Sequence, residues 1–158
     1  MTQKNKHIFV FGIFAVDLSF YVDKKVKPGE TIIAKSSNIG PGGKASNQAI
    51  SARKLGASTT LITRLGNDNF NSYANDIWRR EKLFASTTID KNLPTGMAGI
   101  FIDDKTGENR VIVDPGASAH LSIDDFYLQK SKMKKGDIFL TQFEQSSDTT
   151  FAVLKEAR

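Results

Sequence analysis

The segment Gly40-Pro41-Gly42-Gly43-Lys44 is the part of the sequence best suited to bind a ligand, and a run with helical character, 45–55, follows it directly. Glycines let a ligand approach the main chain, and the first turn of a helix offers N–H groups that have no partner within the helix. A lysine in that turn opposes the helix dipole unless its charge has a partner. Lys44, Asn47 and these amides are therefore expected to surround a hydroxylated ligand.

Two nucleotide-binding motifs do not fit this segment. A P-loop needs a glycine six residues before its lysine and a hydroxyl residue after it, but the sequence has Asn38 and Ala45 there. A dinucleotide fingerprint follows the first strand and has an acid about 20 residues later. Here the first apolar run ends at Ile13, and the later stretch 60–64 contains no acid. A plainer alternative stays open, namely an asparagine cap beside a solvated lysine.

The elements around this segment predict an α/β domain that carries a small β lobe. Continuous apolar runs are typical of parallel strands buried on both faces, and they occur at 8–13, 59–63 and 138–141. Helices are predicted at 45–55, where Gly56 ends the helix, and at 70–81, where apolar residues recur at helical spacing. Further strands are predicted at 18–22, 31–34, 87–89, 97–102 and 110–113.

The last part of the chain carries two predicted helix starts. Ser122 and Asp125 form the pattern of a capping box for a short helix, and Asp148 is expected to cap a final helix running to Arg158. The sequence stops within this helix after only three or four parallel strands have been laid down. We therefore expect these 158 residues to be the first part of a larger domain.

Composition and charge exclude several classes of protein. Hydrophobic residues make up 39% and charged residues 25%, as in globular domains. The absence of cysteine excludes disulfides, cysteine-ligated zinc and a thiol nucleophile. No apolar run approaches the length of a membrane helix, so a cytoplasmic protein without a membrane partner is expected.

The net charge of +5 is spread along the chain, so we expect no nucleic-acid partner. One dense run of lysines, Lys130, Lys132, Lys134 and Lys135, is interpreted as a solvated loop.

The run Gly42-Gly43-Lys44-Ala45-Ser46-Asn47-Gln48-Ala49, with Gly56 and Gly66 at fixed spacing after it, resembles the N-terminal motif of the ribokinase-like (phosphofructokinase-B) carbohydrate kinases. Residues 12–17, 28–31, 95–96, 115–117 and 142–144 extend the resemblance over nearly the whole chain, which would be about half of such a kinase. The resemblance implies a three-layer α/β/α fold with a mostly parallel central sheet. It also implies a β-sheet lid with strands at approximately 17–36 and 96–114, inserted into the N-terminal part of the domain, 1–158.

The resemblance also implies which residues bind substrate. They are expected to contact the sugar from the glycine-rich turn, from two acids and from apolar lid positions: Gly42, Gly43, Lys44, Asn47, Asp17, Glu144, Ala98 and Val113. ATP and Mg²⁺ are the implied cofactors, and a homodimer through the lid is the implied assembly. The family's catalytic aspartate and most of its ATP pocket would lie beyond Arg158, so the chain alone is expected to be inactive.

Two departures from the family pattern bear on the sugar. Ala15 stands where an asparagine is frequent, and Ser118 stands where an asparagine is common. These changes weaken ribose as the substrate and favour a related pentose, a deoxy sugar or a hexose as readily as ribose. The alternative function is a sugar-binding or dimerising remnant without catalytic activity.

Overall fold

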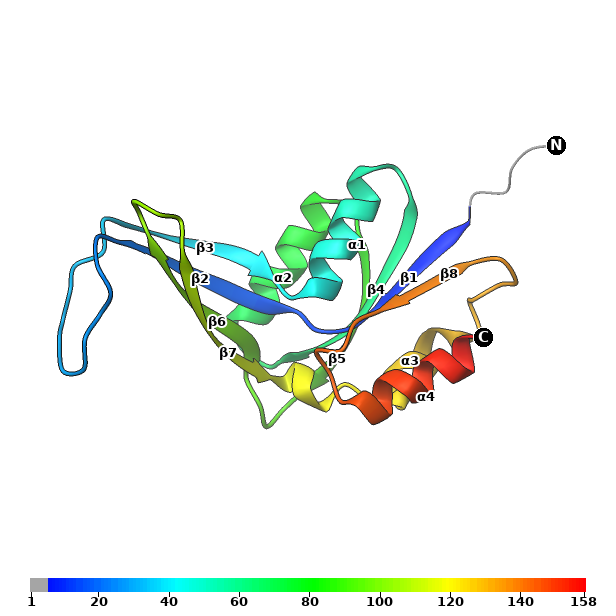
Figure 1. Cartoon of the computed structure of the whole chain (residues 1–158). Coiled ribbons are helices and arrows are strands. Elements are labelled where there is room, and N and C mark those ends of the chain that lie inside the picture. Colours follow the sequence, from blue (N-terminus) through cyan, green and yellow to red (C-terminus); the bar gives the residue numbers. More distant parts are fainter. Residues whose placement is uncertain (1–5) are drawn as a thin grey trace.

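Two four-stranded sheets form the frame of the protein in a computed structural model, which describes residues 6–158. The body sheet, in the order β5-β4-β1-β8, is parallel throughout. The lid sheet has the order β3-β2-β6-β7, with a parallel central pair and antiparallel outer pairs. The lid projects from one end of the body, whereas the C-terminus and the start of β1 lie at the other end (Figure 1).

The bounds of the elements agree with most of the predicted positions. The strands are β1 (His7–Phe11), β2 (Ala15–Val22), β3 (Ser36–Gly42), β4 (Ser58–Gly66), β5 (Phe84–Asp90), β6 (Thr95–Asp103), β7 (Asn109–Gly116) and β8 (Ile138–Thr141). The helices are α1 (Lys44–Lys54), α2 (Asn69–Arg80), the 3₁₀-helix η1 (Ala117–His120), α3 (Ile123–Lys130) and α4 (Ser147–Ala157).

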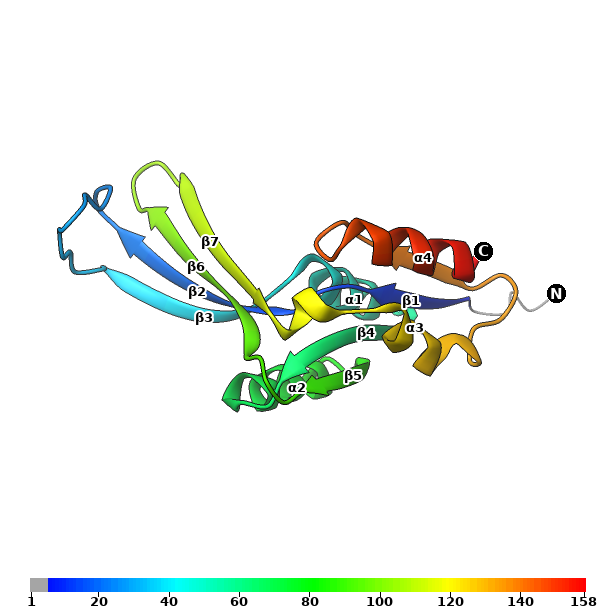
Figure 2. The ribbon, with the colours of Figure 1, turned by 90° about the horizontal axis from the view of Figure 1, so that it is seen from below.

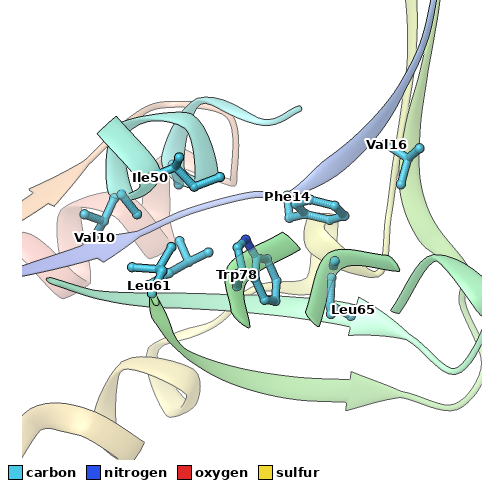
Figure 3. Close-up of a cluster of buried hydrophobic side chains, with 11 residues drawn as sticks. Val10, Phe14, Val16, Ile50, Leu61, Leu65 and Trp78 are labelled. Atoms are coloured by element: carbon cyan, nitrogen blue, oxygen red, sulfur yellow. The ribbon is translucent and has the colours of Figure 1, made fainter. Parts of the chain in front are cut away.

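Helices cover both faces of the body sheet and complete the predicted three layers (Figures 1 and 2). On the face of α1 and α2, Trp78 is fully buried beside Phe14, with ring centroids 5.2 Å apart, and its indole N–H donates to Ser46 Oγ (Figure 3). Small side chains at Ala45 and Ala49 let α1 lie close to the sheet. The face of α3 and α4 buries a second cluster, consisting of Phe9, Phe11, Ile62, Leu121, Phe126 and Val153.

A buried carboxylate connects α3 to the body sheet. Asp125 is 2% exposed, and both of its oxygens accept hydrogen bonds from Arg64, at 3.2 and 2.9 Å. Thr88 also donates to it from β5, and the backbone N–H of Ser122 completes the predicted capping box. A single side chain therefore joins β4, β5 and the first turn of α3.

The lid is fastened to the body at the start of β6. Asp68 caps α2 through the N–H groups of Phe70 and Asn71, and it also accepts hydrogen bonds from the backbone N–H and the hydroxyl of Thr95. The Thr95 hydroxyl in turn accepts a hydrogen bond from the N–H of Gly66, at the end of β4. The end of a body strand and the start of a lid strand are thus held at one point.

Two local predictions are wrong. The second lid strand is β3 rather than 31–34, and it runs through Pro41, which is tolerated because β3 is an edge strand. The cap of α4 is Ser146, whose hydroxyl accepts from the N–H of Thr149, and Asp148 lies inside the first turn. Asp17 lies within the lid strand β2, after the body strand β1 has ended at Phe11.

Replacing Asp125 by alanine is expected to lower the free energy of unfolding by about 3 kcal/mol, since it leaves the Arg64 charge without its buried partner. Asp124→Ala is the matched control, because Asp124 is an exposed acid in the same helical turn. Its loss should stay below about 1 kcal/mol. Urea denaturation of both variants measures the difference. Equal losses would contradict the role assigned to the buried pair.

Candidate functional site

The site begins where β3 runs into α1. Gly43 is the N-cap of α1 and has a φ of +81°, and no side chain caps the helix at this residue. A Cβ atom at Gly43 would lie 2.8 Å from the Cα of Phe14, and one at Gly42 would lie 2.7 Å from a carboxylate oxygen of Asp17. At Gly43 the neighbour is main chain and cannot give way, whereas at Gly42 it is the Asp17 side chain, which can move aside.

The lid brings three predicted site residues into one cross-strand row. In the sheet register Gly40 pairs with Asp17, Asp17 with Ala98, and Ala98 with Val113. Directly paired residues project from the same face of a sheet, so the carboxylate and the two apolar side chains share one surface. Ala98 is buried, whereas Val113 is 53% exposed. The row therefore offers a hydrogen-bond acceptor beside an apolar surface.

The surroundings of Asp17 disfavour the ionised form of its carboxyl group. Partial burial raises the pKa of its carboxyl group above the usual value, and the nearby carboxylate of Glu144 raises it further. Ionisation of Asp17 therefore costs free energy unless donors or a positive charge are supplied. Hydroxyl groups of a ligand would supply such donors and would stabilise the negative charge.

Glu144 comes from the segment after β8 and reaches the first turn of α1. One of its oxygens accepts a hydrogen bond from the backbone N–H of Lys44 at 2.9 Å, and the other is paired with the Lys44 ammonium at 2.5 Å. The carboxylate thus occupies the positive end of the helix, where anions are favoured. Lys44 has a partner for its charge, as its unfavourable position in the helix predicts.

The plainer alternative is half right: Asn47 is not the cap of α1, whereas the Lys44 side chain is 67% exposed although it is paired with Glu144. Asn47 lies inside α1, and its N–H donates to the carbonyl oxygen of Gly43. Its side chain is exposed, as is that of Lys44, on the first turns of the helix. The glycine-rich turn, Asp17 and Glu144 therefore meet at the start of α1, and the lid row extends from Asp17 across the sheet to Ala98 and Val113.

Two polar residues near the site have structural partners that the sequence analysis did not assign. The hydroxyl of Ser118 is fully buried and contacts the carbonyl oxygens of Phe14 and Arg64, at 3.1 and 2.9 Å. Gln142 donates to the side chain of Gln48 on α1, whereas its own Oε1 is buried without a partner in residues 6–158. The position of Gln142 two residues before Glu144 is the only signal in the sequence that could have indicated it.

The family follows from a comparison with known proteins. The model of the pfkB family of carbohydrate kinases matches residues 5–157. The chain belongs to this family. It is 34% identical to a ribokinase of Dictyostelium discoideum over 96% of its length, and 32% identical to a deoxyribokinase of Salmonella typhi over 94%. It spans 48% of each of these two relatives, that is, about half.

Solved structures of ribokinases share this fold. The ribokinase of Giardia lamblia superposes with a TM-score of 0.88 and 26% identity over 96% of this chain and 49% of that one. An Arabidopsis thaliana ribokinase complexed with ribose and ATP has a TM-score of 0.76 and 25% identity, with 97% and 50% covered. The ribokinase-like α/β fold with its mostly parallel sheet is therefore as the sequence predicted. Within residues 6–158, none of the helices is both long and apolar enough to cross a membrane.

The two glycines are expected to respond differently to a methyl group. Gly43→Ala should lower the free energy of unfolding by at least about 2 kcal/mol, because it combines a positive φ with a backbone clash. Gly42→Ala should cost below about 1 kcal/mol, because only the Asp17 carboxylate must move. That movement into solvent should lower the Asp17 pKa toward its usual value, which an NMR titration measures. An unchanged Asp17 pKa in a folded Gly42→Ala variant would contradict the contact.

Proposed function

We propose that the chain is the sugar-binding half of an ATP-dependent carbohydrate kinase that transfers the γ-phosphate of ATP to a sugar hydroxyl. The supporting observation is the meeting of Asp17 from the lid with Glu144 from the body at the open first turn of α1. Carboxylates accept hydrogen bonds from hydroxyl groups, and the glycines admit the ligand to the main chain. The ribokinase complexed with ribose and ATP supports the same ligands for the whole protein.

Each of the predicted site residues receives a role in this proposal. Asp17 and Glu144 accept hydrogen bonds from sugar hydroxyls, and Asn47 offers both a donor and an acceptor. Gly42, Gly43 and Lys44 form the wall against which the sugar lies. Ala98 and Val113 cover an apolar side of the ring, and 1–158 forms the N-terminal part of the kinase domain.

The chemistry proposed for the whole kinase is a direct transfer. The sugar oxygen bonds to the γ-phosphorus, the bond from that phosphorus to the bridging oxygen breaks, and ADP leaves. The hydroxyl proton passes to a base that we place outside this chain, together with most of the ATP pocket. Residues 6–158 contain no group of three or more side chains able to hold a metal ion, so Mg²⁺ is assigned no ligand here. This chain's own contribution is to bind and orient the sugar.

The sugar class stays open among pentoses, deoxy sugars and hexoses. The side chain of Ala15 offers no hydrogen bond, and the hydroxyl of Ser118 contacts carbonyl oxygens of the protein. The relatives include both a ribokinase and a deoxyribokinase. A cytoplasmic location also stays a prediction.

A sugar of the right class is expected to stabilise the 158-residue chain. At 100 times its dissociation constant it should add about 2.7 kcal/mol, which corresponds to a rise of about 5–10 °C in Tm. Ribose, 2-deoxyribose and fructose are the first probes. Asp17→Asn should abolish the rise, whereas Asp23→Asn, on the exposed lid tip, should keep it.

An extension of this experiment distinguishes the two hypotheses, a kinase and a sugar-binding remnant without activity. When the rest of the kinase domain is supplied, a kinase forms ADP only with the sugar that stabilises the chain. Sugar-dependent stabilisation without turnover would favour the binding remnant. The absence of stabilisation by any sugar, with the Asp23 variant and the wild type alike, would count against both.

We also propose that two copies pair through the lid face opposite Asp17. On that face Phe20 and Phe101 stack with centroids 5.9 Å apart, and Ile39 and Ile112 are 55% and 70% exposed. A hollow of about 350 Å³ lies there, with Val22, Phe101 and Ile112 in its lining. An apolar sheet face of this kind is buried by association.

Ile112→Asp is expected to shift the protein toward monomers by at least about tenfold in dissociation constant, because it places a charge in the apolar face. Val111→Asp is the matched control, since the neighbouring residue of the same strand projects from the other face. Sedimentation equilibrium measures both. A wild type that is monomeric at high concentration, or equal effects of the two variants, would overturn the lid-mediated dimer.

A further inference from the structure

The end of the body sheet remote from the lid has a second hollow, of about 740 Å³. It lies at the amino ends of the strands, between the start of β1 and the loop from α3 to β8, which Figure 1 shows beside each other. Its floor is the cross-strand row formed by Phe9, Thr60 and Phe84. The volume lies within the range of small-molecule sites, about 300–1,000 Å³.

Lysines surround this hollow. Lys6, Lys132, Lys134 and Lys135 line it, and Asp137 is the one acid in its lining. None of these four ammonium groups forms an ion pair within the described chain, and residues 1–5 contain no acidic side chain. The lysines of the run 130–135 therefore have two different environments. Lys130 lies on α3 and is paired with Glu156, whereas the later lysines gather around the hollow.

The carboxylate of Asp137 accepts hydrogen bonds from two backbone N–H groups. One oxygen of Asp137 accepts a hydrogen bond from the N–H of His7 at 3.1 Å, and the other accepts from the N–H of Lys134 at 2.9 Å. These hydrogen bonds lower the pKa of Asp137 and fix the turn that carries Lys134 and Lys135. The carboxylate thus fixes the turn, and with four lysines against one acid the lining keeps an excess of positive charge.

Two hydroxyl groups contact the ring of His7, the histidine in the lining. Burial lowers the pKa of His7, although Asp137 acts in the opposite direction. One ring nitrogen lies 2.8 Å from the Ser58 hydroxyl and the other lies 2.8 Å from the Thr60 hydroxyl. His7 is therefore held in the wall of the hollow, and the lysines are the other basic residues of the lining.

The aromatic ring of Phe84 contacts the ammonium group of Lys132 in the lining of the hollow. Phe84 is 55% exposed, and the ammonium of Lys132 lies over its ring, 5.4 Å from the centroid. Such a contact favours one position of an otherwise flexible side chain. Lysines bind phosphate groups as point charges, whereas arginine, whose planar fork matches carboxylate and phosphate alike, is absent from this lining.

We propose that this hollow is an anion site for a small molecule carrying two or more phosphate groups. Lys6 lies just before β1 and the other three lysines lie on the α3–β8 loop, so a ligand with separated phosphates contacts both segments. The site lies at the opposite end of the body from the lid strand β2, which carries Asp17 (Figure 1), and it is independent of the sugar-binding proposal.

Pyrophosphate titration of the 158-residue chain at low salt, followed by calorimetry and by NMR of the lysine side chains, tests this site. Changing Lys132, Lys134 and Lys135 together to glutamine should weaken binding by about tenfold or more. The matched control removes the same charge from exposed positions elsewhere, with Lys91, Lys105 and Lys155 changed to glutamine. The control should bind pyrophosphate within about twofold of the wild type, apart from a general effect of net charge.

Three results would overturn the proposal. They are the absence of saturable pyrophosphate binding at low salt, an equal loss in the control variant, and binding of long polyanions such as RNA without binding of pyrophosphate. Thermal unfolding of both triple variants verifies that they fold. Because the readout is binding of pyrophosphate alone, a failure here leaves the sugar-kinase proposal untouched, and the converse also holds.

Discussion

The close passage of the main chain at Gly43 is the constraint on which the site depends. The junction between β3 and α1 lies against Ile13 and Phe14, the residues that carry the chain from the body into the lid. This contact fixes the start of α1 beside β2, and hence beside Asp17. Because a Cβ atom would separate the two segments, the positions of the helix amides and of the acid are set by one backbone contact.

The charges around that contact are not balanced within the described part of the protein. Glu144 has the N–H and the ammonium of Lys44 as donors, but it also adds to the cost of ionising Asp17. Two carboxylates therefore face one cation at the first turn of α1. A ligand rich in hydroxyl groups relieves this imbalance, whereas an apolar ligand would deepen it. The electrostatics thus favour the sugar ligand that the family implies.

Much of the fold could be predicted from local patterns, and the failures have physical causes. The buried runs around Leu61 and Leu140 and the amphipathic stripe of α2 carry their period in the sequence. The strand β3 was missed because Gly40, Pro41 and Gly42 resemble a turn, and only the edge of a sheet makes them acceptable in a strand. The alignment of Asp17 with Ala98 and Val113 depends on register, which is a tertiary property that local residue types do not encode.

The alternation of the lid strands connects the two proposals made for it. Asp17, Ala98 and Val113 project from one face, and the neighbours Leu18, Gly99 and Ile112 belong to the other. A lid that pairs with a second copy is held in place by that contact before any sugar arrives, so less ordering remains to be done on binding. A slip of one residue in register would exchange the two faces and place Ile112 over the sugar. Thr95, at the base of β6, is hydrogen-bonded to Asp68 and Gly66, and these bonds fix the register of β6. The same bonds therefore keep Asp17 and Ile112 on their respective faces of the lid.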